Sequence, residues 1–180
     1  MSKIIYRLVE FCLALTLLVL LTPIILFTAL LVLITMGRPV FFTQLRPGLN
    51  SKPFTIYKFR TMTVGDKPQV TSVGRWIRKY SLDELPQLLN ILKGDLSFVG
   101  PRPFLMQHLD SYTPEQARRH LVKPGMTGWA QINGRNALKF EEKLKLDVWY
   151  VDNRSIFLDL KIIFITLFVV LSGKNVEYQE

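Results

Sequence analysis

The sequence of 180 residues has little of the chemistry on which small secreted proteins and metal-binding modules depend. Cys12 is its only cysteine, so one chain forms neither a disulfide nor a cysteine metal site. The two histidines, His108 and His120, have no ligand-like partners near them in the sequence. Internal repeats and the recognition signatures of common nucleic-acid-binding modules are also missing. What remains is a chain long enough for one domain with a hydrophobic core.

Charge is missing from the 26 residues between Phe11 and Met36. As one helix this stretch would be about 39 Å long, more than the roughly 30 Å hydrocarbon core of a bilayer. It is too long for the apolar part of a signal peptide, and no cleavage-site pattern follows it. Proline near its middle removes a backbone donor, which predicts a kink at Thr22-Pro23 and two halves that are each too short to cross alone.

Basic residues flank the apolar stretch on both sides, with Lys3 and Arg7 before it and Arg38 and Arg46 after it. The positive-inside rule therefore favours the cytoplasmic side for both ends. A bent, re-entrant hairpin satisfies both flanks, and a straight span satisfies one. Because transmembrane helices tolerate proline, the residues alone leave both topologies open.

The formal net charge of +9 belongs entirely to the first 82 residues. Eleven lysines and arginines stand there against two acidic residues, whereas twelve basic residues meet twelve acidic ones from Asp83 onward. A cationic region beside an apolar segment suits an anionic membrane surface, a phosphate-bearing substrate, or both. Nucleic acid is the competing anion, and we expect none because its recognition signatures are absent.

The rest of the chain predicts an α/β domain that is mostly helical with one short β-hairpin. Strands are expected at 40–46 and 53–60, joined by turn residues at 47–51. A polar loop is expected at 61–72 and a glycine-punctuated loop at 123–136, with helices at 73–80, from 83 to Gly94, from Thr113-Pro114, and at 139–151. The apolar stretch 156–171 has only 16 residues, so it is either a core helix or a helix in the membrane interface.

Asp83 and Glu84 lie side by side in SLDELPQLLN. Ser81 and Glu84 have the spacing of a capping box, but Pro86 favours a helix that begins at Asp83. In either case both carboxylates lie at a helix N-terminus, where the dipole favours the ionised form. One interpretation is that the two carboxylates only cap the helix. The other is that they are catalytic, because an ionised aspartate can attack phosphorus and an adjacent glutamate can bind a divalent cation.

Arg102 lies between two prolines in Gly100-Pro101-Arg102-Pro103. The following proline pushes it toward an extended backbone, and both prolines stiffen it. A rigid arginine can grip a phosphate with two parallel hydrogen bonds. The alternative is a stiff surface turn.

Arg135 lies in GWAQINGRN, a loop of glycines and amides at 128–136. Such a backbone can present successive N–H groups to an anion, with the arginine alongside. The alternative is a hairpin through Asn133-Gly134.

Lys58 and Arg60 alternate with aromatic residues in YKFRTM, so their side chains share one face of the predicted strand. That face is either solvated or phosphate-binding. Asp159 is a carboxylate on an apolar helix. Lys161 is two residues away and does not face it, so Asp159 requires another partner, either a basic residue or a metal.

Three stretches, YKFRTM, RKYSLDELPQLLNILKGDLSFVGPRP and VKPGMTGWAQINGRN, occur in an order and spacing that resemble the bacterial sugar transferases called small monotopic phosphoglycosyl transferases. The resemblance runs essentially from end to end. It implies transfer of a phosphosugar from a UDP-sugar to polyprenol (undecaprenyl) phosphate, through a covalent aspartyl-phosphosugar, with release of UMP. The product, a polyprenol-diphosphate sugar, begins glycan assembly and would pass to downstream glycosyltransferases.

The resemblance also implies roles for individual residues. Asp83 matches the nucleophile, and Glu84 matches the partner carboxylate that is associated with Mg²⁺, so both are expected at the metal. Arg102 and Arg135 match phosphate-binding arginines. Three other polar positions of the active site are matched by Lys58, Arg78 and Asp159.

For the N-terminal stretch, the resemblance implies a helix broken at a Ser-Pro pair that enters and leaves by one leaflet, with Thr22-Pro23 in its place here. Threonine can bond to the preceding backbone as serine does. The expected division is a re-entrant helix at 1–37 and a catalytic domain with interfacial helices at 38–180, on the cytoplasmic face of the bacterial inner membrane. The alternative function is a non-catalytic, membrane-anchored basic module that binds acidic lipid or nucleic acid.

Overall fold

The computed structural model describes residues 3–134 and 138–172. Over these ranges the chain is mostly helical with a short antiparallel hairpin, as predicted. The α-helices are α1 (Lys3–Leu20), α2 (Thr22–Met36), α3 (Ser72–Lys79), α4 (Leu88–Lys93), α5 (Pro114–Ala117), α6 (Trp129–Ile132), α7 (Phe140–Asn153) and α8 (Ile156–Ser172). The strands are β1 (Phe41–Pro47), β2 (Pro53–Phe59), β3 (Ser97–Val99) and β4 (Gly125–Thr127), and the 3₁₀ helices are η1 (Leu49–Ser51), η2 (Leu82–Gln87), η3 (Met106–Ser111) and η4 (Arg118–Leu121).

The contacts within the chain divide it into two compact units. The first unit holds the described residues up to Gln44 together with Ile56–Lys93, and the second holds Leu45–Thr55 and the described residues from Gly94 onward. The β1–β2 hairpin therefore has its open end in the first unit and its turn in the second. The predicted boundary at residue 37 separates membrane from cytosol, which is a different division, and it stays a prediction.

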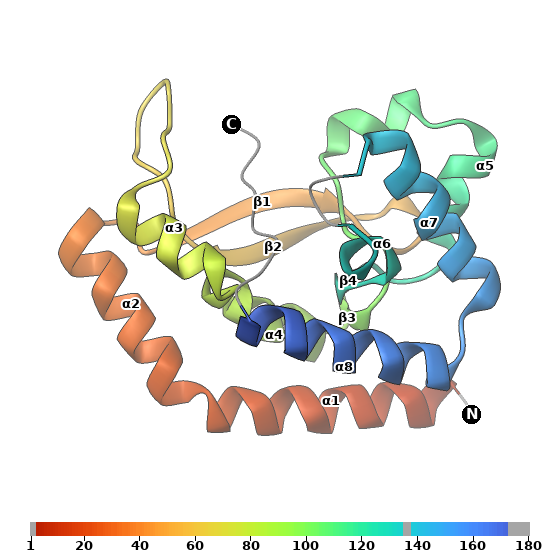
Figure 1. The fold of residues 1–180 in the computed structure, drawn as a ribbon, viewed down its shortest axis with the longest axis horizontal. Helices are drawn as coiled ribbons and strands as arrows, with labels where there is room; N and C mark the ends of the chain where they lie inside the picture. The colour runs from red at the N-terminus through yellow and green to blue at the C-terminus, as the bar shows by residue number, and fades with distance from the viewer. Residues whose placement is uncertain (1–2, 135–137, 173–180) are drawn as a thin grey trace. The chain divides into compact units, whose positions relative to one another are not determined.

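In the first unit, α1 and α2 meet at Leu21 with a bend of 60° (Figure 1). Pro23 has no N–H, and its ring would clash with the carbonyl of the fourth residue before it in a continuous helix. The Thr22 hydroxyl donates to the Leu18 carbonyl at 2.8 Å, which is the bond expected of threonine at this break. The predicted kink is confirmed. Among the described helices none is long and apolar enough by itself to cross a bilayer, whereas this bent pair together passes that test.

The core of the first unit lies where α2, β2 and α3 meet. Val32, Phe59 and Ile77, one from each element, are almost fully buried there. Gly74 of α3 allows the close approach, because a Cβ at this position would lie 2.0 Å from the Thr61 carbonyl oxygen. The other helix of the bent pair, α1, packs against α4. The Arg7 guanidinium of α1 donates to two carbonyls at the C-terminus of α4.

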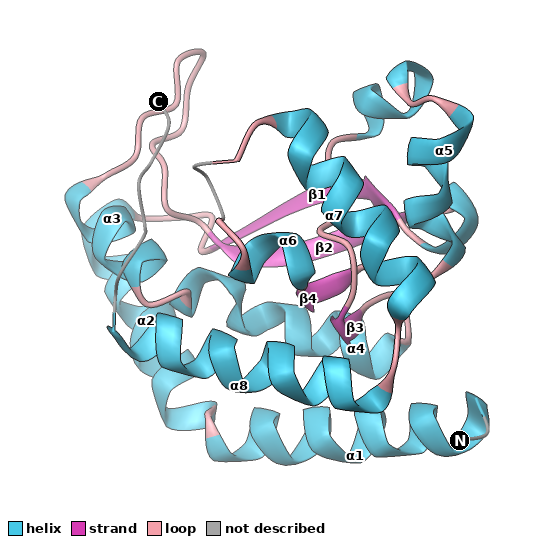
Figure 2. Cartoon of the chain, turned by 45° about the vertical axis from the view of Figure 1, so that its right-hand side comes forward, coloured by secondary structure: helices cyan, strands magenta, loops and turns pink. Residues whose placement is uncertain are grey.

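In the second unit, β3 and β4 pair in parallel, and α8 packs against them and against α6 (Figure 2). Val99, Tyr150 and Ile162 form its buried core. The loop predicted at 123–136 therefore contains a strand and a short helix, and the alternative of a hairpin at Asn133-Gly134 is wrong, because this pair follows α6. Three-residue strands are too short to show a periodic pattern.

Helix α8 confirms one of the two interpretations of the apolar stretch 156–171, since Ile162 lies in the core. Its remaining surface is also apolar: Phe157, Phe164 and Phe168 are 85%, 74% and 69% exposed. Placement of this helix in a membrane interface stays a prediction.

Candidate active site

Asp83 and Glu84 lie in the first turn of η2, in the first unit. Ser81 takes a left-handed conformation with φ of 54°, and its side chain makes no capping bond, so the predicted capping box is wrong. Its carbonyl instead accepts from the Glu84 N–H at 3.1 Å. The regular helix starts at Leu88 and not at Asp83, because Pro86 within η2 supplies no donor. Both carboxylates are thus presented by a tight 3₁₀ turn.

The Lys58 ammonium reaches Glu84 from β2 and donates to its Oε1 at 2.6 Å. The two side chains are only 18% and 14% exposed, so solvent screens this ion pair less than a surface pair. The Asp83 residue beside it is 9% exposed. Two of the predicted site residues are therefore in direct contact, and the proposal that Lys58 lies on a solvated face is wrong.

Arg78 and Arg60 are also in the first unit, each with a defined contact. Arg78 extends from α3, and its Nε donates to the Thr61 hydroxyl at 2.8 Å. Arg60 is 7% exposed and donates through one nitrogen to the carbonyls of Met36 and Gly37, at 2.5 and 2.7 Å. These bonds satisfy carbonyls at the C-terminal end of α2. Arg60 is thus not on a solvated face, and its predicted contact with phosphate stays a prediction.

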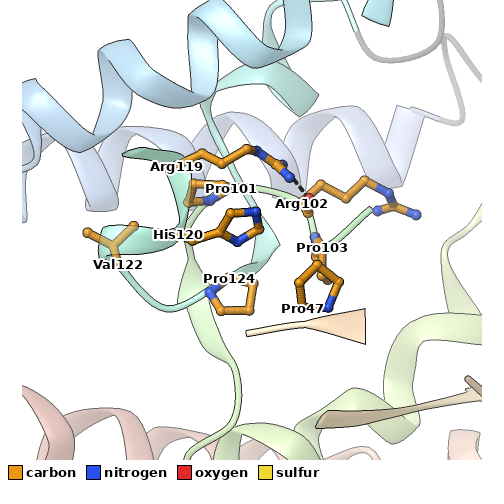
Figure 3. A pocket seen from close by; sticks show the side chains of 8 residues that line it. All are labelled: Pro47, Pro101, Arg102, Pro103, Arg119, His120, Val122 and Pro124. Atoms are coloured by element: carbon orange, nitrogen blue, oxygen red, sulfur yellow. Dashed lines mark hydrogen bonds between the residues drawn. The ribbon is translucent and has the colours of Figure 1, made fainter. Parts of the chain in front are cut away.

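Arg102 lies in the second unit, where its backbone is held firmly. Its carbonyl accepts from Arg119 at 2.6 Å, and the next carbonyl, that of Pro103, accepts from Arg46 at 3.2 Å. Burial, followed by the charge of Arg102, lowers the pKa of Arg46. Four prolines pack around this segment and leave no internal space for water (Figure 3): Pro47, Pro101, Pro103 and Pro124. These contacts hold the backbone of the Pro-Arg-Pro segment in place, and its predicted stiffness stays a prediction.

Asp159 has the partner that its apolar helix requires. Its Oδ1 accepts from the Tyr150 hydroxyl at 2.6 Å, and its Oδ2 lies 3.9 Å from Nε of Arg154. Lys161 lies elsewhere, with its ammonium 5.6 Å from the centroid of the Trp129 ring. The expected partner of Asp159 was a basic residue or a metal. The described contacts favour the basic residue, Arg154, together with the Tyr150 hydroxyl. Arg135, the remaining predicted residue, lies outside the described residues.

The donor set for a metal is the pair of adjacent carboxylates in η2. Within residues 3–134 and 138–172, no cluster of three or more histidine, cysteine, aspartate or glutamate side chains could hold an ion. Magnesium is commonly bound by one or two carboxylates together with water and substrate phosphates. Asp83 and Glu84 therefore fit magnesium by chemistry, and the ion itself stays an expectation.

A buried ion pair that was not predicted from the sequence joins Arg119 and Asp147, each about 1% exposed. Burial raises the pKa of Asp147 to about 6, and the neighbouring Arg119 acts in the opposite direction. The neighbouring His120 has its pKa lowered to about 4, chiefly by burial and then by Arg119. One signal was available: Asp147 follows Leu144 by three residues and falls on the buried face of α7.

Comparison with known proteins places these residues in a family. The family model described as "Bacterial sugar transferase" matches residues 1–173. The chain belongs to the bacterial sugar transferase family. The predicted resemblance and the prediction of an enzyme are both confirmed at this level.

Three relatives show how the family varies in length. The sugar transferase EpsL of Bacillus subtilis, itself described as uncharacterized, is 57% identical over 97% of this chain and 91% of its own length. The UDP-glucose:undecaprenyl-phosphate glucose-1-phosphate transferase of Escherichia coli is 39% identical over 93% of this chain, but the match covers only 40% of that protein. An undecaprenyl-phosphate galactose phosphotransferase of Salmonella typhimurium is 38% identical over 75% of this chain and 34% of its own length.

Proposed function

We propose that this protein transfers a phosphosugar from a UDP-sugar to polyprenol phosphate, with Asp83 as a covalent nucleophile. The observation that carries the proposal is the η2 turn, where Asp83 and the Lys58–Glu84 ion pair occur together in a chain of this family. Two of the three relatives are named for action on undecaprenyl phosphate, with UDP-glucose as the donor in one case. The sugar used by this chain is open, because these relatives differ in it.

In the first step, a carboxylate oxygen of Asp83 attacks the sugar-linked phosphorus of the UDP-sugar. The bond between that phosphorus and the oxygen bridging to the uridylate phosphorus breaks, and UMP leaves with the bonding electrons. The sugar phosphate is then held on Asp83 as a mixed acyl-phosphate anhydride. A carboxylate serves in this role because it is ionised at neutral pH and is itself a good leaving group in the next step.

In the second step, an oxygen of polyprenol phosphate attacks the same phosphorus. The bond from phosphorus to the Asp83 oxygen breaks, which restores the carboxylate and forms the polyprenol-diphosphate sugar. No net proton is required, since an ionised phosphate oxygen is the nucleophile and a carboxylate is the leaving group. Two in-line displacements at one phosphorus let a single site serve a soluble and a lipid substrate in turn.

Other residues of the proposed site are expected to supply charge and orientation. The Lys58 ammonium donates to one oxygen of Glu84, which orients the Glu84 carboxylate. Asp83 and Glu84 would hold Mg²⁺, which offsets phosphate charge when bound. Arg78 and Arg102 are proposed to bind phosphate oxygens, as is Arg135, because attack by an anion on a diphosphate needs compensating positive charge.

We further propose that the bent α1–α2 pair enters and leaves the cytoplasmic leaflet, so that the enzyme works at the membrane surface. The apolar composition of the pair, its bend, and the basic flanks Arg7 and Arg38 support this arrangement. It brings the chain to the lipid phosphate while it stays open to soluble UDP-sugar. The product would pass to enzymes that extend glycans on a lipid carrier.

The experiment is a UMP-release assay with Mg²⁺, undecaprenyl phosphate and a panel of UDP-sugars. We expect UMP release with at least one sugar, and a loss of about 10³-fold or more in Asp83→Asn. Asp110→Asn, an exposed carboxylate of η3, is the matched control and should retain full activity. Without the lipid acceptor, a UDP-sugar labelled in its sugar should release one equivalent of UMP and label the wild-type protein but not Asp83→Asn.

Two results would count against the proposal. Full activity in Asp83→Asn would rule out this nucleophile. Absence of sugar-dependent UMP release across the panel, together with binding of acidic vesicles, would favour the non-catalytic basic module instead.

A further inference from the structure

Arg119 is a charged side chain that the second unit buries almost completely, at 1% exposure. Its Nε and Nη2 both donate to Oδ2 of Asp147, at 3.1 and 2.6 Å. Nη1 donates to the Tyr112 hydroxyl at 3.3 Å. Burying a guanidinium costs free energy unless the group is paired. The contacts that Arg119 makes in the fold must therefore offset this cost. Neither the reaction steps proposed above nor the family resemblance assigns a role to Arg119.

The same guanidinium contacts the segment that carries Arg102 at two points. Its Nη2 also donates to the Arg102 carbonyl at 2.6 Å, and its central carbon lies 4.3 Å from the centroid of the Phe104 ring. The contact with the ring is within the range of a cation–π interaction. Arg119 therefore joins Asp147 of α7 to the Arg102 carbonyl and to the Phe104 ring, on either side of Pro103.

The Pro-Arg-Pro segment has few other ways to be held. Pro101 and Pro103 have no N–H, so two of its three residues cannot donate to a neighbouring strand. Its three carbonyls are all occupied instead: that of Pro101 accepts from the Gly125 N–H at 3.0 Å, and the next two accept from Arg119 and Arg46. Figure 3 shows the Arg102 side chain running away from Arg119, on the other side of the backbone.

We propose that Arg119 is a positioning residue that sets the direction of the Arg102 guanidinium. This role rests on the proposed function, in which Arg102 binds a phosphate of the substrate. Arginine is required at this position because its planar fork reaches a carboxylate and a carbonyl at the same time. Lysine is a compact point charge, and it can keep the ion pair with Asp147 only by giving up the carbonyl of Arg102. Arg119→Lys therefore separates the positioning contact from charge balance in the core.

The first measurement is amide hydrogen exchange of the peptide that covers residues 98–105 in the full-length protein. We expect exchange in this peptide to be about tenfold faster or more in Arg119→Lys than in the wild type. Arg118→Lys is the matched control, because Arg118 is the preceding residue of η4 and its partners are the exposed side chains of Glu115 and Asp152. Unchanged exchange in Arg119→Lys would overturn the proposal, and this outcome does not depend on any activity.

The second measurement is a double-mutant cycle on UMP release. Arg119→Lys alone should lower kcat/KM about tenfold or more, with Arg118→Lys within about twofold of the wild type. In an Arg102→Ala background the same change should lower kcat/KM by less than about twofold, because the side chain that Arg119 directs is gone. A full tenfold loss in that background would mean that Arg119 acts by general stability and would overturn the proposal.

The two measurements also separate this inference from the proposed function. If the wild type releases no UMP with any sugar, the proposed function fails, while the exchange data still decide whether Arg119 holds the segment. If UMP is released and exchange stays unchanged, the positioning role fails alone.

Discussion

The ion pairs of Arg118, of Arg119 and of Lys58 differ in how far solvent reaches them, and their expected contributions to stability differ accordingly. Arg118 pairs with exposed carboxylates, where solvent and salt leave little net stabilisation. Arg119 and Asp147 are buried, so removal of either leaves a charge without compensation. Lys58 and Glu84 lie between these limits, which keeps the pair oriented and still open to a substrate.

Replacing Lys58 with methionine should lower kcat/KM for UMP release by about 10- to 100-fold, because Glu84 loses its partner beside Asp83. The free energy of unfolding should fall by about 1 kcal/mol, since the pair is partly buried. Lys145→Met, an exposed lysine of α7, is the control for loss of charge. If Lys58→Met and Glu84→Gln prove fully additive in the double variant, the two residues do not act as a pair.

His120 should make stability depend on pH. Its pKa is about 4 in the folded protein and 6.5 when unfolded, so between these values the unfolded state binds more protons. Its contribution is complete above pH 6.5 and is lost as the pH falls toward 4, by up to about 3 kcal/mol. Thermal unfolding of the wild type and His120→Gln at pH 7.5, 6, 5 and 4 measures the difference. Asp147 titrates in both proteins, so it does not account for a difference between them; parallel pH curves would contradict the prediction.

At the scale of elements, short structures present the chemistry and longer helices support them. The η2 turn carries both carboxylates, and it continues directly into α4. Helix α4 has six residues, too few to be stable alone, and its last carbonyls lack partners within the helix. Arg7 of α1 supplies donors to two of them.

Arg7→Met should therefore destabilise the first unit by about 1–2 kcal/mol, because the carbonyls of Ile91 and Leu92 lose charged donors at a helix C-terminus. For a chain of this size the loss corresponds to a Tm lower by roughly 2–8 °C. The measurement is thermal unfolding in one detergent, with Arg38→Met as the control for an exposed cation. An equal Tm in the two variants would show that the bonds from Arg7 to α4 do not support it.

Elements with a clear local sequence signal were predicted well. The bend at Thr22-Pro23, the β1–β2 hairpin, α3, the Thr113 cap of α5, α7 and α8 all appear close to their expected positions. The parallel pair of β3 and β4 was missed, because each strand has three residues and they are joined through space across about 25 residues of chain. Neither the capping-box spacing of Ser81 nor a helix start at Asp83 corresponds to the structure, because Ser81 takes a left-handed backbone and η2 precedes the regular helix.

At the scale of the whole molecule, the predicted site residues fall in both units. Asp83, Glu84, Lys58 and Arg78 belong to the first, whereas Arg102 and Asp159 belong to the second. Helices with exposed apolar side chains also occur in both, in α1–α2 and in α8. Each unit therefore carries both polar residues proposed for catalysis and a surface suited to lipid.

The re-entrant arrangement predicts that both ends of the α1–α2 pair face the cytoplasm. In a Cys12→Ser background, Lys3→Cys and Thr43→Cys should both react with an impermeant maleimide in inverted membrane vesicles, and neither should react in intact cells. Thr43 is exposed on β1 and is not one of the proposed site residues. Reaction of one of the two from each side would establish a true span and overturn the arrangement.

The sequence by itself determined the family and the bent apolar pair, and it selected Asp83, Glu84 and Arg102 as proposed site residues, because these inferences depend on residue type and local spacing. Only the tertiary structure decided that Lys58 holds Glu84, that Arg60 caps the end of α2, and that Arg119 links Asp147 to the Arg102 backbone. These contacts join residues between 17 and 28 positions apart. Local propensity contains no information on such distances, and the packing of buried side chains determines which charges meet.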